Sequence, residues 1–400
     1  MTRMSRRLLK YHSQDLFFGL KPVKLNDFVA NYKQPIIIYD LNVIKERISW
    51  IQGWKKLGKL HYAVKANFHL DILKLIKAQN CGVDVVSLGE IKRCLEAGFS
   101  MQDIIFSGVG KSNAELSWAI EKDIYQINVE SLSEIKKISV LTKQLNKSVQ
   151  LGLRINPEVD AETHKSISTA LKDSKFGLDL ETAKIAIQVI ANNPQLKLTA
   201  LSFHLGSQIM NVSVFEKALS VMKPFYLQTK EKCPELNCFD LGGGIGIDYK
   251  NSDSDEDHKR WLQLQDVFEK ELADFEAFYQ LEIGRFLVAR SGVMISRVEV
   301  IKETPHRRFL ILDAGMTQLM RPALYGAYHE ILPLKFVNGT PTEYDIVGPI
   351  CESTDVLGAG RKLTPIKEDE FVAICDVGAY GSVMASRYNL RDEAIEIVLP

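Results

Sequence analysis

Apolar and polar residues follow two alternating patterns between about residue 60 and residue 285. Short, nearly continuous apolar runs are typical of strands buried on both faces, and longer amphipathic segments of helical period separate them. The predicted strands cover residues 60–66, 82–87, 103–108, 124–130, 149–157, 198–206, 238–244 and 280–285. The predicted helices cover residues 69–79, 88–98, 112–122, 131–145, 180–193 and 261–280. Periodicity alone also fits an open, doubly wound sheet, but a count of eight strands favours a (β/α)8 barrel.

The pattern changes after Arg285, where loops rather than helices join the predicted strands. These strands cover residues 292–304, 307–315, 342–350 and 370–378. The early apolar run PIIIYD would be a ninth strand in a barrel of eight, so we assign it to the second domain. The sequence therefore predicts the α/β class: a TIM-like barrel over residues 41–285, and a β-rich domain, β-sandwich or β-barrel-like, from residues 1–40 and 286–400.

The acidic stretch NSDSDEDHK, residues 251–259, interrupts the barrel pattern. Its spacing lacks the glycine and the terminal glutamate of a calcium-binding loop. We interpret it as a solvated surface loop, and we predict no metal site anywhere in the chain.

Composition narrows the function classes without naming one. The 50 basic and 50 acidic residues give a net charge of zero, which argues against a protein that binds nucleic acid or membranes through a broad positive field. The six cysteines are scattered without a CxxC pair, so neither a disulfide framework nor a zinc ribbon is expected. The basic N-terminus is not followed by an apolar segment, and we expect a cytoplasmic protein.

Polar residues and glycines stand where the predicted barrel strands end. In a barrel of this kind the carboxyl ends of the strands carry the catalytic groups. The residues at these ends are Lys65, Asp84, Arg154, His204, Ser207, Gly242 to Gly244, Glu282 and Arg285. Six strand ends with side chains of complementary charge predict one shared site.

Each of these residues has a structural and a chemical interpretation. Lys65 on an apolar strand would have a depressed pKa suited to Schiff-base chemistry, or it would merely extend from the rim. Asp84 and Arg154 fit a structural ion pair equally well. The glycine run after the seventh strand is either a tight turn or a phosphate-binding loop, and its place in the barrel favours the second.

His204 and Glu282, at the ends of the sixth and eighth predicted strands, suggest a particular cofactor. His204 is either a core histidine or a ring that stacks on an aromatic cofactor, with Ser207 reaching a phosphate. Glu282 could hold a proton on a pyridine nitrogen. A lysine, a phosphate cradle, a stacking ring and such a carboxylate together predict pyridoxal 5'-phosphate.

Three further motifs lie in the second domain: RPALYGAYH, GPICESTD and DVGAYGSVMASRYN. Arg321 and Arg285 could each bind a carboxylate with two hydrogen bonds. Cys351 stands beside Glu352 in a loop bounded by glycine and proline, which makes it a candidate proton donor. Cys81, Cys94 and Cys375 lie in apolar runs and are expected to be inert.

An ordered series of motifs in residues 62–381 resembles the diaminopimelate branch of the barrel-fold (fold-type III) pyridoxal-phosphate decarboxylases. The motifs are YAVKAN, HLGSQ, LGGGIGIDY, EIGRFLVARSG, RPALYGAYH, GPICESTD and DVGAYG. The resemblance implies Lys65, His204 and Cys351 as catalytic residues. It implies cofactor contacts from Lys65, Asp84, Arg154, His204, Ser207, Gly243, Gly244, Glu282, Gly284, Arg285 and Tyr380. It implies substrate contacts from Arg285, Arg321, Tyr325, Glu352 and Tyr380.

The implied reaction is decarboxylation of meso-2,6-diaminopimelate to L-lysine by a homodimer. Cys351 of the partner subunit would protonate the carbanion left after CO2 departs. The family usually has proline where this chain has Ile283, which affects the backbone of the loop rather than its functional neighbours. Three alternatives remain open: a decarboxylase for another amino acid or a siderophore or polyamine precursor, a racemase of the same barrel family, and a silent cofactor-binding homologue.

Overall fold

The computed structural model describes residues 8–160 and 174–399, and these residues form two compact units. The barrel unit comprises the described residues of Ile48–Gly246 and Lys259–Gly284. The β unit comprises the described residues of Met1–Arg47, Ile247–His258 and Arg285–Pro400. Among the described residues, no helix is long and apolar enough to cross a bilayer.

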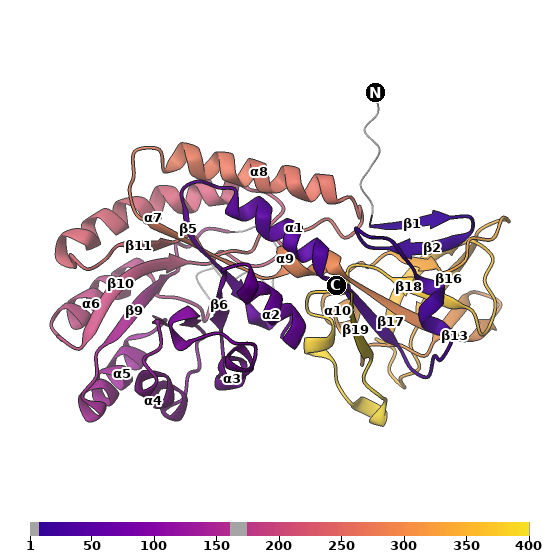
Figure 1. Ribbon diagram of the computed structural model, residues 1–400, viewed down its shortest axis with the longest axis horizontal. Coiled ribbons are helices and arrows are strands. Elements are labelled where there is room, and N and C mark those ends of the chain that lie inside the picture. The colour runs from indigo at the N-terminus through magenta and orange to yellow at the C-terminus, as the bar shows by residue number, and fades with distance from the viewer. Residues whose placement is uncertain (1–7, 161–173, 400) are drawn as a thin grey trace. The chain divides into compact units, whose positions relative to one another are not determined.

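Eight parallel strands form a closed barrel in the barrel unit (Figure 1). They are β5 (Leu57–Ala63), β6 (Gly82–Val85), β7 (Ile104–Phe106), β8 (Gln126–Val129), β9 (Val149–Ile155), β10 (Leu196–Phe203), β11 (Cys238–Asp240) and β12 (Phe278–Ile283). Each strand pairs with the next, and β12 pairs with β5, so the ring has no free edge. The predicted (β/α)8 barrel is confirmed, and the open sheet is excluded.

Helices follow the barrel strands, one further helix precedes the first of them, and several helices begin at a serine that caps them. The longer helices are α1 (Leu41–Gln52), α2 (Leu70–Ala78), α3 (Leu88–Glu96), α4 (Asn113–Glu121), α5 (Leu132–Leu145), α6 (Leu180–Ala191), α7 (Ser213–Lys232) and α8 (Ser254–Glu271). Ser87, Ser112 and Ser131 each accept a hydrogen bond from the backbone N–H three residues on. The predicted segments did not include α1 or α7. Proline is unusual in a helix interior, and α7 contains Pro224.

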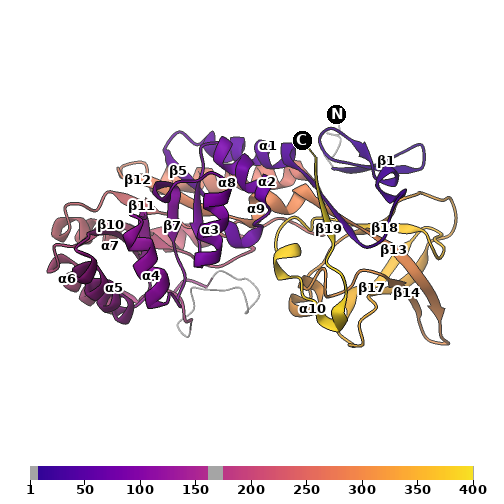
Figure 2. The same cartoon turned by 60° about the horizontal axis from the view of Figure 1, so that its bottom comes forward.

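The β unit is built on a mixed sheet with the order β15-β18-β13-β14-β16-β17 (Figure 2). Its strands are β13 (Gly292–Glu303), β14 (Arg308–Leu312), β15 (Ile331–Pro333), β16 (Thr342–Val347), β17 (Val356–Leu363) and β18 (Phe371–Ile374). The run PIIIYD contributes β4 (Ile36–Asp40), which pairs with β13 and with the C-terminal β19 (Ile395–Leu399). The assignment of this run to the second domain is therefore correct.

Short elements complete the β unit. They are β1 (Leu9–His12), β2 (Asp15–Phe18), β3 (Val23–Lys24), α9 (Arg285–Val288) and α10 (Arg321–Tyr325). The first three form a small separate sheet. Phe18, Ile38, Val293 and Leu334 belong to one apolar core, so segments from distant parts of the sequence stabilise one another by burial.

The acidic stretch 251–259 is not the solvated loop that its charge predicts. Helix α8 begins at Ser254, and Asp257 is fully buried. Asp257 Oδ2 lies 2.6 Å from Arg47 Nη2 and 2.8 Å from Arg290 Nε. Arg290 also donates to Asp376 Oδ2 at 2.7 Å. These buried ion pairs hold residues 247–258 within the β unit, although the sequence pattern puts that segment in the barrel domain.

We expect Asp257→Asn to lower the free energy of unfolding by about 3–5 kcal/mol. The variant would leave Arg47 and Arg290 buried with too little negative charge to compensate them. Urea denaturation followed by tryptophan fluorescence measures the change. Glu181→Gln is the matched control: Glu181 pairs with Lys184 on an exposed helix surface, where the loss should stay below about 1 kcal/mol. Equal stability of the two variants would contradict the expectation.

The same carboxylate should make stability depend on pH. Burial alone would raise the pKa of Asp257, but Arg47 and Arg290 outweigh it and hold that pKa below its ordinary value. The stabilisation is therefore complete above the unfolded-state pKa of about 4, and it is lost as the pH falls through the lower folded-state value. The stability gap between wild type and Asp257→Asn should shrink below about pH 4.

Candidate active site

Lys65 lies one residue beyond the first barrel strand rather than on it. Strand β5 ends at Ala63, and Lys65 occupies a short 3₁₀ turn, Val64–Ala66. The predicted placement of Lys65 on the strand is therefore wrong. Its Nζ atom is 3.3 Å from Asp84 Oδ2, so an amine and a carboxylate meet at the ends of adjacent strands. Asp84 Oδ1 is buried and has no hydrogen-bond partner among the described residues, which leaves one oxygen available to a ligand.

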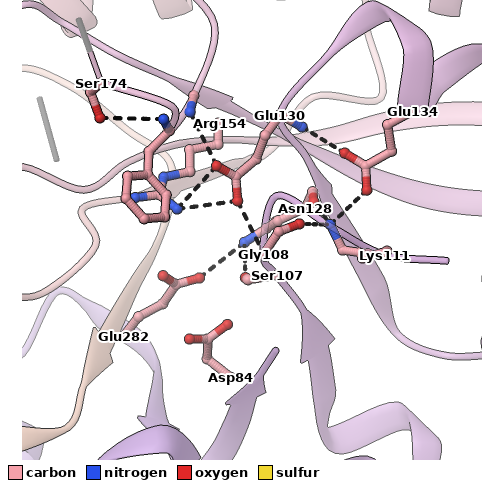
Figure 3. A network of polar contacts seen from close by, with 12 residues as sticks. Asp84, Ser107, Gly108, Lys111, Asn128, Glu130, Glu134, Arg154, Ser174 and Glu282 are labelled. Carbon is pink, nitrogen blue, oxygen red and sulfur yellow. Dashed lines mark hydrogen bonds and ion pairs between the residues drawn. The ribbon is translucent and has the colours of Figure 1, made fainter. Parts of the chain in front are cut away.

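Arg154 forms its ion pair with Glu130, not with Asp84 (Figure 3). Its Nη1 atom lies 3.2 Å from both carboxylate oxygens of Glu130. Glu130 also accepts hydrogen bonds from the backbone N–H groups of Gly108 and Gly177. Glu130 was not among the predicted site residues, although it stands directly after β8 at the same edge of the barrel. Glu130 fixes the orientation of Arg154, and it links the loops that follow β7, β8 and β9.

Glu282 is held by a buried amide (Figure 3). Asn128 Nδ2 donates to Glu282 Oε1 at 3.0 Å and to Ser107 Oγ at 3.0 Å. Gln126 Nε2 donates to Asn128 Oδ1 at 2.7 Å, which leaves the Asn128 amino group to face Glu282. A Cβ atom at Gly152 would overlap Asn128 Oδ1, so this arrangement requires glycine there. Neither Asn128 nor Gln126 was a candidate, because each lies on a strand rather than at its end.

The carboxyl groups at this end of the barrel are difficult to ionise together. Burial raises the pKa of Glu282 well above its ordinary range, and the neighbouring Asp240 and Asp84 raise it further. Burial also raises the pKa of Asp240. A buried carboxyl group of this kind favours a partner that donates a proton or carries positive charge.

His204 directly follows β10. Burial lowers its pKa well below the usual value, and the positive charges of Arg154 and Lys65 act in the same direction. The imidazole ring is therefore neutral at physiological pH, as a ring that stacks on a flat ligand can be.

The glycine run after β11 is required by close backbone packing. A Cβ atom at Gly243 would overlap the carbonyl oxygen of Glu282, and one at Gly244 would overlap that of Gly206. Gly242 has a φ of +66° and donates its N–H to Asp240 Oδ1 at 2.8 Å. Gly284 packs against the turn that carries Lys65, where a Cβ would lie 3.0 Å from Ala66 Cβ. These glycines bring the loops after β10, β11 and β12 together without intervening side chains.

The β unit holds a second cluster, centred on two buried arginines. Arg285 Nη1 donates to the hydroxyl of Tyr249 at 3.0 Å, and its guanidinium lies 4.7 Å from the ring centre of Tyr380. Arg321 lies 4.2 Å from the ring centre of Tyr249, and its Nη1 is 2.7 Å from His329 Nε2. Tyr249 and His329 were not candidates, although each is the last residue of a motif that identified its neighbours.

The remaining predicted residues of the β unit differ in exposure and backbone geometry. Cys351 and Glu352 are exposed in the loop between β16 and β17, and Glu352 accepts a hydrogen bond from Tyr388 at 2.7 Å. Tyr325 is half-buried at the end of α10. Tyr380 has a φ of +56°, a left-handed conformation that is costly for a residue with a side chain. Ser207 is half-buried in the loop after β10 of the barrel unit.

Comparisons with known proteins agree on one family. Residues 41–289 match the family described as "Pyridoxal-dependent decarboxylase, pyridoxal binding domain". The diaminopimelate decarboxylase of Aquifex aeolicus is 34% identical over 98% of this chain and 92% of its own, and that of Campylobacter jejuni is 37% identical over 92% and 91%. The structure of Helicobacter pylori diaminopimelate decarboxylase complexed with L-lysine has a TM-score of 0.88 at 34% identity and covers 94% of each chain. The lysine decarboxylase of Selenomonas ruminantium, 22% identical with a TM-score of 0.84, shares the fold.

The matched domain covers the barrel, and identity above 30% extends over the β unit as well. The chain therefore belongs to the diaminopimelate decarboxylase family of pyridoxal-dependent decarboxylases.

Proposed function

We propose that this protein catalyses the decarboxylation of meso-2,6-diaminopimelate to L-lysine and CO2, with pyridoxal 5'-phosphate as its cofactor. The observation that carries the proposal is the barrel cluster: an amine beside a carboxylate, a buried carboxyl group of raised pKa, and a side-chain-free glycine loop. The family assignment supports the same chemistry.

The barrel residues fit the chemical groups of this cofactor. Lys65 offers the amine that would attach it covalently. The loop of Gly243 and Gly244, with Ser207, offers backbone N–H groups and a hydroxyl to a phosphate. Glu282 offers a buried carboxyl group to a pyridine nitrogen, and this partner would relieve the excess of carboxyl groups around it.

When bound, pyridoxal phosphate supplies an electron sink for the electron pair released as CO2 leaves. Glu282, oriented by Asn128, would hold a proton at the ring nitrogen, and neutral His204 would stack on the ring. Asp84 would fix the Lys65 amine, and Glu130 would orient Arg154 as a supporting cation. The predicted cofactor contacts of Gly284, Arg285 and Tyr380 are part of the proposal.

The β unit would recognise the part of the substrate that does not react. Arg285, Arg321 and Tyr325 would bind its distal carboxylate, Glu352 would bind its distal ammonium, and Tyr380 would contact the substrate. Cys351 of the partner subunit in a homodimer would deliver a proton to the carbon that loses CO2. A cytoplasmic location is proposed from the low number of cysteines, which are scattered along the sequence without a CxxC pair.

Purified protein supplied with pyridoxal phosphate should release CO2 from meso-2,6-diaminopimelate and form L-lysine in equal amount. A panel with ornithine, arginine, lysine and L,L-diaminopimelate measures selectivity. Faster turnover of another substrate would favour the alternative decarboxylases, and turnover of none would contradict an enzymatic role.

Lys65→Ala should abolish the visible absorption of bound cofactor and reduce turnover by several orders of magnitude, because it removes the amine that lies beside Asp84. Absorption spectra and a CO2-release assay measure the two effects. Lys74→Ala, on the exposed surface of α2, is the matched control and should behave as wild type. Retained turnover in Lys65→Ala would exclude its assigned role.

Cys351→Ala should reduce kcat about 100-fold or more while leaving cofactor affinity within a few-fold of wild type, because the thiol acts on the reacting carbon and not on the cofactor. Turnover assays and fluorescence titration with pyridoxal phosphate separate the two. Ser353→Ala, exposed in the same loop, controls for damage to the loop. Equal losses of turnover and cofactor binding would remove Cys351 as the acid.

A further inference from the structure

Arg321 is a buried cation, and no carboxylate among the described residues forms a hydrogen bond or an ion pair with it; the charge of Asp376 acts on it only from a greater distance. Only 4% of its surface is exposed, and its contacts are an imidazole nitrogen and an aromatic face. Its Nε atom has no hydrogen-bond partner among the described residues. Burial lowers the pKa of this guanidinium, which reflects the cost of keeping the charge there. A buried charge without a counter-ion is strongly destabilising unless a ligand supplies the opposite charge.

His329 is arranged to accept a hydrogen bond from Arg321. Its Nδ1 atom is 2.7 Å from the carbonyl oxygen of Cys375, which can only accept, so Nδ1 carries the proton. Nε2 therefore presents a lone pair to Arg321 Nη1, 2.7 Å away. Burial and the charge of Arg321 lower the pKa of His329 well below its usual range, which keeps the ring neutral. The imidazole orients the guanidinium without neutralising it.

Tyr249 connects the two arginines. Its hydroxyl accepts a hydrogen bond from Arg285 Nη1 at 3.0 Å, and its ring lies under the guanidinium of Arg321 at 4.2 Å. The ring also meets the edge of His329, with centroids 5.2 Å apart. Because the ring is 94% buried, it has little freedom to turn. One phenol thus sets the positions of two like charges that would otherwise repel each other.

We propose that Tyr249 and His329 are positioning residues that hold Arg285 and Arg321 as a paired anion site and thereby select substrates with a distal carboxylate. Neither residue needs to touch the substrate. Tyr249 aligns both guanidiniums, and the neutral His329 holds Arg321 without placing a negative charge in contact with it, so that the guanidinium can pair with the incoming carboxylate. The proposal rests on the proposed decarboxylase function, because it assigns the selectivity of that site.

Tyr249→Phe removes the acceptor for Arg285 but keeps the ring under Arg321. We expect its KM for meso-2,6-diaminopimelate to rise about tenfold, the usual effect of losing a hydrogen bond to a charged group, with kcat within about twofold of wild type. Calorimetry on the holoenzyme gives a reading independent of turnover. L-lysine, which has a carboxylate, should bind to Tyr249→Phe about tenfold more weakly than to wild type. Pentane-1,5-diamine, which lacks the carboxylate, should bind to both proteins with the same affinity.

His329 variants test the second residue. His329→Leu removes the acceptor and should weaken L-lysine binding at least tenfold, while His329→Gln offers an amide oxygen in its place and should recover part of the loss. Tyr344→Phe, at another buried tyrosine of the same unit, should change neither ligand. Circular dichroism and cofactor absorption confirm that each variant is folded and loaded.

The outcomes separate this proposal from the proposed function. Selective loss of L-lysine binding supports the positioning role, whereas equal loss of L-lysine and pentane-1,5-diamine, or no loss in either Tyr249→Phe or His329→Leu, overturns it. Failure of the wild-type enzyme to form lysine from diaminopimelate would instead contradict the proposed function.

Discussion

Closure of the barrel by the pairing of β12 with β5 decides where the reactive groups lie. The register of this pairing sets Glu282 opposite His61 and Ile283 opposite Tyr62, so the last strand ends beside the turn that carries Lys65. Gly284 allows the chain to pass that turn closely. If the barrel were open between β12 and β5, these two strands would be its opposite edges, and an amine and a carboxyl group separated by more than 200 residues of sequence would not share a site.

Each unit contains one buried cluster of unbalanced charge, and the two clusters are opposite in sign. In the barrel unit, Asp84, Asp240 and Glu282 lie close together, and burial followed by the charges of the two aspartates raises the pKa of Glu282. In the β unit, Arg285 and Arg321 adjoin tyrosine rings and a neutral histidine. One cluster suits a protonated ring nitrogen and the other suits a carboxylate. A net charge of zero for the whole chain therefore conceals two local imbalances of opposite sign.

The sequence predicts a feature well where the pattern within one segment decides the local structure. It predicts poorly the contacts between side chains that come from distant segments. The periods of strands and helices predicted the barrel. Predicted motif residues such as Glu282 and Arg321 lie in the two clusters described above. Lys65 was placed on a strand because residues 60–66 read as one apolar run, yet the chain turns after Ala63. Asp257 looked like a surface charge because its partners, Arg47 and Arg290, are distant in sequence. Supporting residues such as Asn128 and Glu130 can be recognised only from the side chains they contact.

The pairing of β4 has a consequence for how the chain is made. This apolar strand is synthesised before the barrel strands, whereas its partners β13 and β19, which begin at Gly292 and Ile395, are synthesised after them. The barrel strands between them are complete by Ile283 and can fold while the ribosome is still at work. Until β13 has been made, β4 is an unpaired apolar strand open to aggregation, and its second edge stays exposed until β19 follows. Truncation before Ile395 would leave that second edge permanently exposed.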